Sequence, residues 1–131
     1  MKLFIKNIIA LILGVLCGMI INMGLIIIGG KIMPFPENFI PMNAMDWNLK
    51  YFIFPFLAHS IGTLSGSFVA SKLSKKYHIM IPLIVGIYFL SGGIYMAIIL
   101  PAPIWFTCLD LIACYIPMAL LGWSLTKNKH S

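Results

Sequence analysis

Two ionisable side chains, His59 and Asp110, lie inside long apolar stretches of this sequence and are its best candidates for chemistry. An acid at the centre of a membrane helix costs about 2.5–3.5 kcal/mol, so we expect Asp110 to face other helices rather than lipid. Two states of this acid are open, because burial favours a neutral carboxyl whereas a protonated His59 favours a carboxylate. We predict a direct contact between His59 and Asp110.

Asn22, Thr63 and Tyr95 are expected to complete a buried polar site around this pair. Counted at 1.5 Å per residue, each of the four apolar segments carries a polar residue about 7–12 Å from the same end of the bundle. In each segment this residue lies on the face that carries small side chains. The sequence therefore predicts one polar layer shared by four helices. That layer is either a proton- or ligand-responsive site or a set of hydrogen bonds that holds the helices together.

Residues 51–71 are expected to form the central helix, because one face is small or polar and the opposite face is bulky. On a 3.6-residue period the small face gathers His59, Gly62, Thr63, Gly66, Ser67 and Ala70. In the first apolar segment, Gly14 and Gly18 form a G-x-x-x-G pair, a common surface for close packing of membrane helices. We expect Gly62 and Gly66 to serve the same purpose. Whether the first segment packs within the chain or against another copy stays open.

Sequence motifs of known enzymes and metal sites are absent. There is no nucleophile elbow, phosphate loop, H-E-x-x-H or paired-carboxylate pattern. One histidine and one aspartate do not make a coordination sphere, so we expect no metal and no cofactor. The three cysteines lie in apolar segments without CxxC spacing, which predicts packing residues rather than disulfides. We expect that the protein is not an enzyme.

The composition is typical of a membrane protein. Of its 131 residues, 61% are hydrophobic and 9% are charged, and the mean hydropathy is +1.02. Soluble domains carry roughly 25% charged residues. The net charge is +6, but the lysines lie at the ends of apolar runs and there is no arginine. This pattern favours a topology signal and contact with anionic lipid over nucleic-acid binding.

Four apolar segments are long enough to cross a bilayer as helices, which takes about 20 residues. The first starts like a signal peptide but is longer than a signal h-region and lacks an A-x-A site, so we expect it to stay uncleaved. Residues 31–50 form an outer loop in which prolines prevent a regular helix. The sequence therefore predicts one all-α membrane domain over residues 1–131, a four-helix transmembrane bundle with spans at about 8–30, 51–71, 79–100 and 104–124.

The lysines beside these spans predict a single orientation. Seven lysines lie on the side of the two termini and the 72–78 connection, and two, Lys31 and Lys50, lie on the other side. Lysine is enriched in cytoplasmic loops. We therefore expect a multi-pass protein of the bacterial inner (cytoplasmic) membrane with both termini in the cytoplasm.

Several short patterns from the second span onward carry a resemblance to other proteins. They are His59-Ser60-Ile61-Gly62-Thr63, Gly92-Gly93-Ile94, Pro101-Ala102-Pro103-Ile104-Trp105-Phe106, Asp110-Leu111 and Pro117-Met118-Ala119 with Gly122. In these positions the chain resembles a loose group of small bacterial four-span membrane proteins of uncharacterised function, which implies the fold and no activity. Small multidrug transporters and dual-topology fluoride channels are similar in size. The former carry a glutamate in the first span, which this chain lacks, and the latter lack its lysine asymmetry.

Two functions are compatible with these features. The first is a structural or accessory inner-membrane component whose polar layer holds its helices together. The second is a small transporter or channel component that uses His59 and Asp110. A water-accessible pocket that reaches Asp110 favours the second, and a closed, fully paired cluster favours the first. Besides the bilayer, a second copy or a membrane partner subunit is a possible partner, and nucleic acid is not expected.

Overall fold

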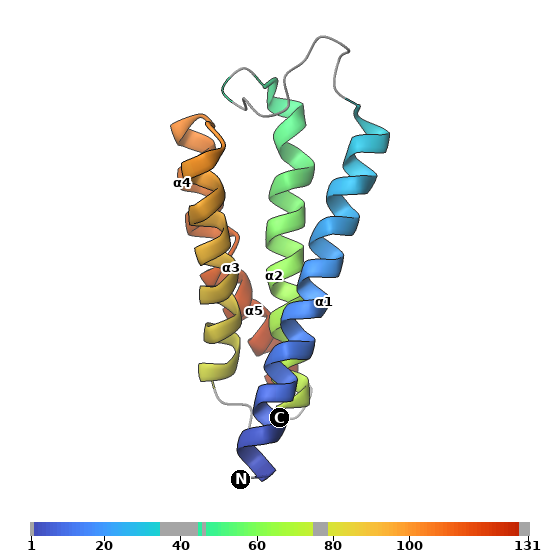
Figure 1. The fold of residues 1–131 in the computed structure, drawn as a ribbon, viewed down its shortest axis with the longest axis vertical. Coiled ribbons are helices and arrows are strands. Elements are labelled where there is room, and N and C mark those ends of the chain that lie inside the picture. Colours follow the sequence, from blue (N-terminus) through green and yellow to red (C-terminus); the bar gives the residue numbers. More distant parts are fainter. Residues whose placement is uncertain (1, 35–44, 46, 75–78, 129–131) are drawn as a thin grey trace.

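The computed structural model describes residues 2–34, 45, 47–74 and 79–128, and these are arranged as a bundle of helices (Figure 1). No strand occurs among the described residues, so the all-α prediction is confirmed for them. The elements in chain order are α1 (Lys2–Ile32), the 3-10 helix η2 (Leu49–Phe52), α2 (Ile53–Leu73), α3 (Met80–Ile99), α4 (Ile104–Ala113) and α5 (Ile116–Asn128).

Four stretches of the described chain are long and apolar enough to cross a membrane: Lys2–Ile32, Leu49–Leu73, Met80–Ile99 and Ile104–Thr126. They follow the order of the predicted spans, and the first extends beyond the predicted 8–30 at both ends. The start of α1 and the end of α5 lie at the same end of the bundle (Figure 1). This arrangement agrees with an even number of crossings.

Two sequence predictions fall partly on residues outside the described ones. The predicted outer loop includes residues 35–44 and 46, and the orientation prediction uses Lys75, Lys76 and Lys129. At the two ends of that loop, residues 31–32 belong to α1 and residues 49–50 belong to η2. Both ends of the predicted 31–50 loop are therefore helical, so the connection between the helices is shorter than the sequence predicted.

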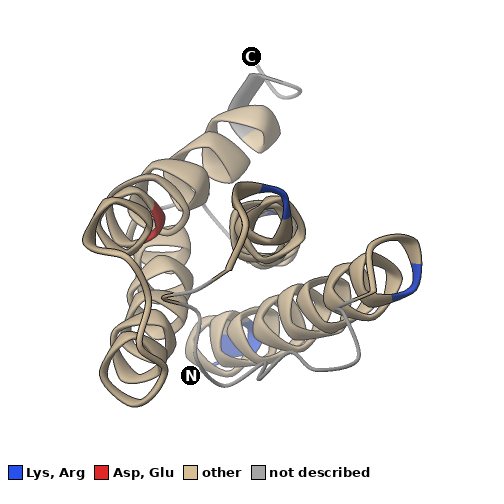
Figure 2. Cartoon of the chain, turned by 90° about the horizontal axis from the view of Figure 1, so that it is seen from above, with Lys and Arg blue, Asp and Glu red and all other residues tan. Residues whose placement is uncertain are grey.

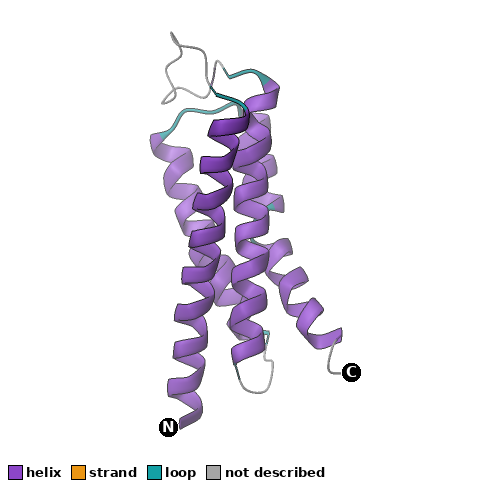
Figure 3. Ribbon diagram, turned by 90° about the vertical axis from the view of Figure 1, so that its right-hand side faces the viewer, coloured by secondary structure: helices purple, strands orange, loops and turns teal. Residues whose placement is uncertain are grey.

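The fourth span contains a break that its predicted bounds of 104–124 did not include. Helix α4 ends at Ala113, and α5 starts at Ile116. Pro117 has no amide hydrogen to donate to the carbonyl of Ala113, and its ring crowds that carbonyl. It occupies the second position of α5, in the first turn, where proline is well tolerated. Because of the break, α5 runs at an angle to α2 toward the C-terminal end (Figure 3).

Helix α2 is the centre of the bundle, as its small-residue face predicted. It contacts α1, α3, α4 and α5, whereas α1 packs on α2 and touches α3 less extensively. Seen from above, α2 lies between α1 on one side and the other helices on the other (Figure 2). Most of its buried positions are small residues, including Gly62, Gly66 and Ala70.

The glycines of α1 and α2 bring the two backbones into direct contact. A Cβ atom at Gly14 would lie 2.6 Å from the carbonyl oxygen of Gly66 and 2.6 Å from the Cβ of Ala70. A Cβ atom at Gly18 would lie 2.7 Å from the carbonyl oxygen of Gly62. No side chain larger than hydrogen fits at these positions without a shift of the helices. The G-x-x-x-G pair therefore packs within the chain.

The remaining surface of α1 is apolar and exposed. Its buried residues are all small, namely Ala10, Gly14, Gly18 and Gly29. Its isoleucines, leucines and methionines point outward, with Ile20 71% exposed. A continuous apolar surface of this extent is typical of a helix that contacts lipid or another protein. The packing surface of α1 is thus a narrow stripe of small residues, together with Leu11 and Val15, which pack against the buried cluster of Ala70, Ile81 and Val85.

We predict that Gly14→Val destabilises the protein and that Gly24→Val does not. Both substitutions put the same β-branched residue into α1. The valine side chain at position 14 would clash with the backbone of α2, whereas nothing lies within 4 Å of a Cβ at Gly24. Overpacking of this kind typically costs about 1–3 kcal/mol. Thermal unfolding of the two variants in detergent micelles measures the difference. Equal melting temperatures would show that the α1–α2 contact is not tightly packed.

Candidate functional site

His59 on α2 and Asp110 on α4 are in direct contact. The distance between His59 Nδ1 and Asp110 Oδ1 is 2.6 Å, and the side chains are 24% and 8% exposed. A contact this short is typical of a charge-assisted hydrogen bond in which the imidazole N–H donates to a carboxylate oxygen. Asp110 is the only acidic residue among the described ones, and its contact with His59 places it on the side of α4 that faces α2. The contact that the sequence predicted is therefore present.

The second oxygen of the carboxylate is bound by Tyr115, which the sequence analysis did not select. The Tyr115 hydroxyl donates to Asp110 Oδ2 over 3.2 Å, and the tyrosine is 2% exposed. Its ring also stacks on the His59 ring, with 5.9 Å between centroids and 28° between planes. On one regular helix, residues five apart differ by about 140° in direction, so Tyr115 would point away from Asp110. The break between α4 and α5 brings it back.

Glycine on α3 makes room for the tyrosine. A Cβ at Gly93 would lie 2.5 Å from the Tyr115 hydroxyl and 2.7 Å from the nearest ring atoms. The break itself is held against α2 by two hydrogen bonds to backbone carbonyls. Cys114 donates from its thiol to Phe56 over 3.6 Å, and the Ser67 hydroxyl donates to Ala119. These contacts fix the segment from which both Asp110 and Tyr115 project.

Two residues predicted to bind the pair do not do so. The Thr63 hydroxyl is buried and donates to the carbonyl of His59, one turn earlier in α2, over 2.8 Å. Tyr95 is 63% exposed and makes no hydrogen bond to Asp110. The cause is the rotation of α3: Gly93 faces Tyr115, and a residue two positions later is turned by about 200°. The prediction that these two side chains satisfy Asp110 is wrong.

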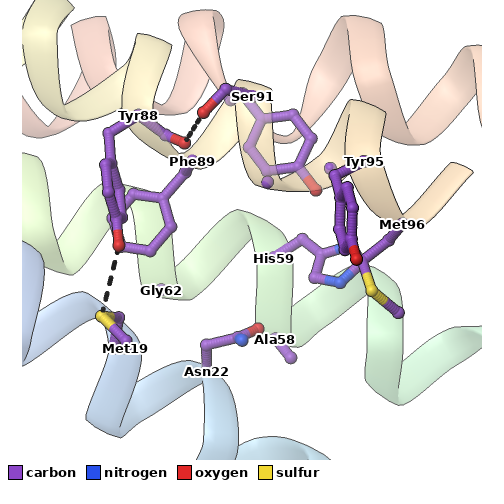
Figure 4. Close-up of a pocket in the computed structure, with 13 residues that line it drawn as sticks. Met19, Asn22, Ala58, His59, Gly62, Tyr88, Phe89, Ser91, Tyr95 and Met96 are labelled. Atoms are coloured by element: carbon purple, nitrogen blue, oxygen red, sulfur yellow. Dashed lines mark hydrogen bonds between the residues drawn. The ribbon is translucent and has the colours of Figure 1, made fainter.

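Asn22, on α1, lies beside the pair without bonding to it. Its side-chain oxygen is buried and has no hydrogen-bond partner among the described residues. A Cβ at Gly62 would lie 3.1 Å from the Cβ of Asn22, so the two helices are close at this level. Figure 4 shows the Asn22 carboxamide directed between α1 and α2, on the side where His59 lies. An unpaired buried amide oxygen is costly, and natural structures contain few of them.

Two cavities meet at the His59–Asp110 pair. The large cavity, of about 470 Å³, lies among α1, α2 and α3 (Figure 4). The small cavity, of about 210 Å³, extends from the pair toward η2 and the turn before α4, and its wall includes Asp110, Thr107 and Phe106. His59 lines both cavities, together with Gly93 and Met96. The pair is therefore the polar partition between two spaces.

The predicted polar layer is present in part. His59, Asn22 and Tyr95 all line the large cavity, and Asp110 lines the small one, whereas Thr63 lines neither. Tyr115 replaces Thr63 and Tyr95 as the third member of the hydrogen-bonded cluster. Within the described parts of the chain, no three His, Cys, Asp or Glu side chains gather where one metal ion would reach them. The chemistry available here is proton binding and hydrogen bonding by the imidazole–carboxylate pair.

Comparisons with known proteins found no match. No protein-family model matches the chain, and no curated protein or solved structure does so either. Function is therefore inferred from the geometry of the cavities and the pair.

We predict that Tyr115→Phe lowers the free energy of unfolding and that Tyr95→Phe leaves it unchanged. Each substitution removes one hydroxyl, but only the Tyr115 hydroxyl binds Asp110. Hydrogen bonds of this kind contribute about 0.5–1.5 kcal/mol, and those between membrane helices average about 0.6 kcal/mol. Reversible unfolding in mixed detergent micelles measures both values. A loss at Tyr95 equal to that at Tyr115 would contradict the assignment.

Proposed function

We propose that this protein is a multi-pass protein of the bacterial inner membrane that acts as a small transporter or channel component. Its orientation follows the lysines, with both termini in the cytoplasm and the 31–50 connection outside. Four stretches of membrane-spanning length and the exposed apolar surface of α1 support a place in the bilayer. The small cavity then opens toward the outside, because it is lined by Trp47 and Phe52 near that end.

One observation carries the proposal: cavities border both members of the His59–Asp110 pair. A cluster that only holds helices together is expected to be closed and fully paired. Here the Asn22 oxygen has no partner among the described residues, and no described group bonds to His59 Nε2. Ionisable residues inside membrane helices usually face such spaces when they serve transport.

The pair has the chemistry of a proton-responsive site. With a neutral imidazole, the pair carries one negative charge, and uptake of one proton makes it neutral overall. His59 is accessible from both cavities, and Asp110 borders the small one. A change of charge at the partition alters the attraction between α2 and α4 and the hydration of both spaces. This is the physical basis on which a proton gradient would drive or gate movement of a solute.

The proposal predicts that water reaches Thr107 but not Ile112. Both lie on α4, but Thr107 lines the small cavity, whereas Ile112 is 72% exposed on the surface assigned to lipid. In a variant without its native cysteines, Thr107→Cys should react with a charged, membrane-impermeant thiol reagent added to intact cells. Ile112→Cys should stay unmodified, since lipid excludes the reagent. If Thr107→Cys is as unreactive as Ile112→Cys, the cluster is closed and an accessory, structural function is the better conclusion.

We further predict that His59 and Asp110 are needed for function in cells. A strain without the protein should grow less well at acid or alkaline pH. The wild-type gene and Met23→Leu should restore growth, because Met23 lines neither cavity. His59→Ala and Asp110→Asn should fail although both proteins are present in the membrane at wild-type amounts. Full restoration by both variants, or a deletion without any effect on growth, would refute the proposal.

A further inference from the structure

We propose that the large cavity binds an organic cation, an amine or ammonium group carried on an apolar body. This inference rests on the proposed function, because it names the substrate class of the same site. Four properties of the cavity lead to it: its size, the aromatic rings in its wall, the charge of the His59–Asp110 pair and the excess of hydrogen-bond acceptors.

The size and polarity of the cavity suit a small organic molecule. Its volume of about 470 Å³ falls within the range of roughly 300–1,000 Å³ that is usual for small-molecule sites. Much of the wall is apolar, with Met19, Phe89 and Met96 on different sides (Figure 4). Such a wall favours a ligand with an apolar body, and the few polar groups then determine which head group is accepted.

Aromatic rings form much of the remaining wall. Tyr88, Phe89, Tyr95 and Tyr115 line the cavity together with the imidazole of His59. The Tyr88 and Phe89 rings stand at 84° to one another with 5.4 Å between centroids, so they form a corner. The face of an aromatic ring attracts a cation within about 6 Å, and the attraction increases where water is excluded. Several rings around one space favour a positively charged head group.

The charge of the wall excludes anions and accepts cations. None of the described lysines lines either cavity, and the pair is the only group there that carries a formal charge. A contact of 2.6 Å requires one proton between His59 Nδ1 and Asp110 Oδ1, so the pair is either negative or neutral. Neither state attracts an anion. The negative state attracts a cation.

Most polar groups of the wall offer acceptors, the exceptions being the Tyr95 hydroxyl and the amide nitrogen of Asn22. Three hydroxyls already donate elsewhere: Ser91 to the Tyr88 carbonyl over 2.6 Å, Tyr88 to Met19 Sδ over 3.9 Å and Tyr115 to Asp110. Their oxygens keep free lone pairs. His59 Nε2 is an acceptor whenever the imidazole is neutral and Nδ1–H points to Asp110. The unpaired oxygen of Asn22 is a further acceptor once its amide turns toward the space. An ammonium group, which has donors only, complements this set.

Binding of a cation and binding of a proton should exclude one another. Protonation of His59 cancels the negative charge of the pair and removes the acceptor at Nε2. The other titratable groups near the pair are Tyr115 and Cys114 at the break and Tyr88 and Tyr95 of α3; α1 contributes no titratable residue to the cavity wall. Entry of a cation beside the neutral state of the pair therefore releases one proton from His59 to water. A lower pH should weaken the affinity for the cation.

The test compares ligands that share one apolar body and differ in charge. The purified full-length protein in lipid nanodiscs is titrated with 4-phenylbutyl-trimethylammonium, 4-phenylbutylammonium, 4-phenylbutanol and 4-phenylbutyrate, and binding is followed by calorimetry. We expect saturable binding of the two cations and affinities at least about tenfold lower for the alcohol and the carboxylate. The affinity for the trimethylammonium probe, whose own charge is constant, should fall as the pH of the buffer is lowered.

Variants locate the binding. Asp110→Asn should reduce cation affinity about tenfold, whereas His59→Gln, which removes the group that takes up the proton, should abolish the dependence of the affinity on pH. Asn22→Leu changes the cavity wall without changing the His59–Asp110 pair, and it should weaken the binding of 4-phenylbutylammonium. Met23 lies next to Asn22 in the sequence but does not line the cavity, so Met23→Leu should leave this binding unchanged. Equal affinities of all four probes, or tightest binding of the carboxylate, would overturn the inference. If this happens while Thr107→Cys remains accessible, only the substrate class is wrong. If Thr107→Cys is closed but cation binding depends on Asp110, the site exists and the transport function is wrong.

Discussion

The bundle depends on the burial of one carboxylate in an apolar interior. Asp110 is 6% exposed, and such a group is stable only when its oxygens are hydrogen-bonded. His59 of α2 binds one oxygen, and Tyr115 at the break binds the other. Three consequences follow: α4 must pack with Asp110 toward α2, the fourth span must break so that Tyr115 can turn back, and α3 must present Gly93 to that ring.

Close packing of small residues on α2 holds the other helices around the buried carboxylate. Gly14 and Gly18 of α1 contact the backbone of α2 on one side, and Gly122 of α5 contacts it on the other. A Cβ atom at Gly122 would lie 2.5 Å from the carbonyl oxygen of Leu64. Because α1 packs almost entirely on α2, it does not close against α3. The large cavity is the space left between them. The same small residues that stabilise the centre of the bundle therefore create the opening beside His59.

The functional proposal follows from this combination of a satisfied carboxylate and unsatisfied neighbours. Asp110 has a partner for each oxygen, whereas Asn22 and the outer nitrogen of His59 have none among the described residues. Aromatic rings and acceptor oxygens surround the space that Asn22 and His59 line. A wall of this kind is stabilised by a donor from outside the chain, which is the physical reason to assign it a cationic ligand.

The sequence by itself determined the helices, the central place of α2, the small-residue faces of α1 and α2 and the His59–Asp110 pair, but it left open whether α1 packs within the chain. These depend on local apolarity, on the 3.6-residue period and on the cost of a buried acid, all of which are properties of single segments. Only the tertiary structure decided that Tyr115 completes the site, that Tyr95 is left exposed, that Thr63 bonds within its own helix, and that cavities border the pair. Those outcomes depend on how far each helix is rotated about its axis and on the two-residue break between α4 and α5, which shifts every later side chain to a new direction.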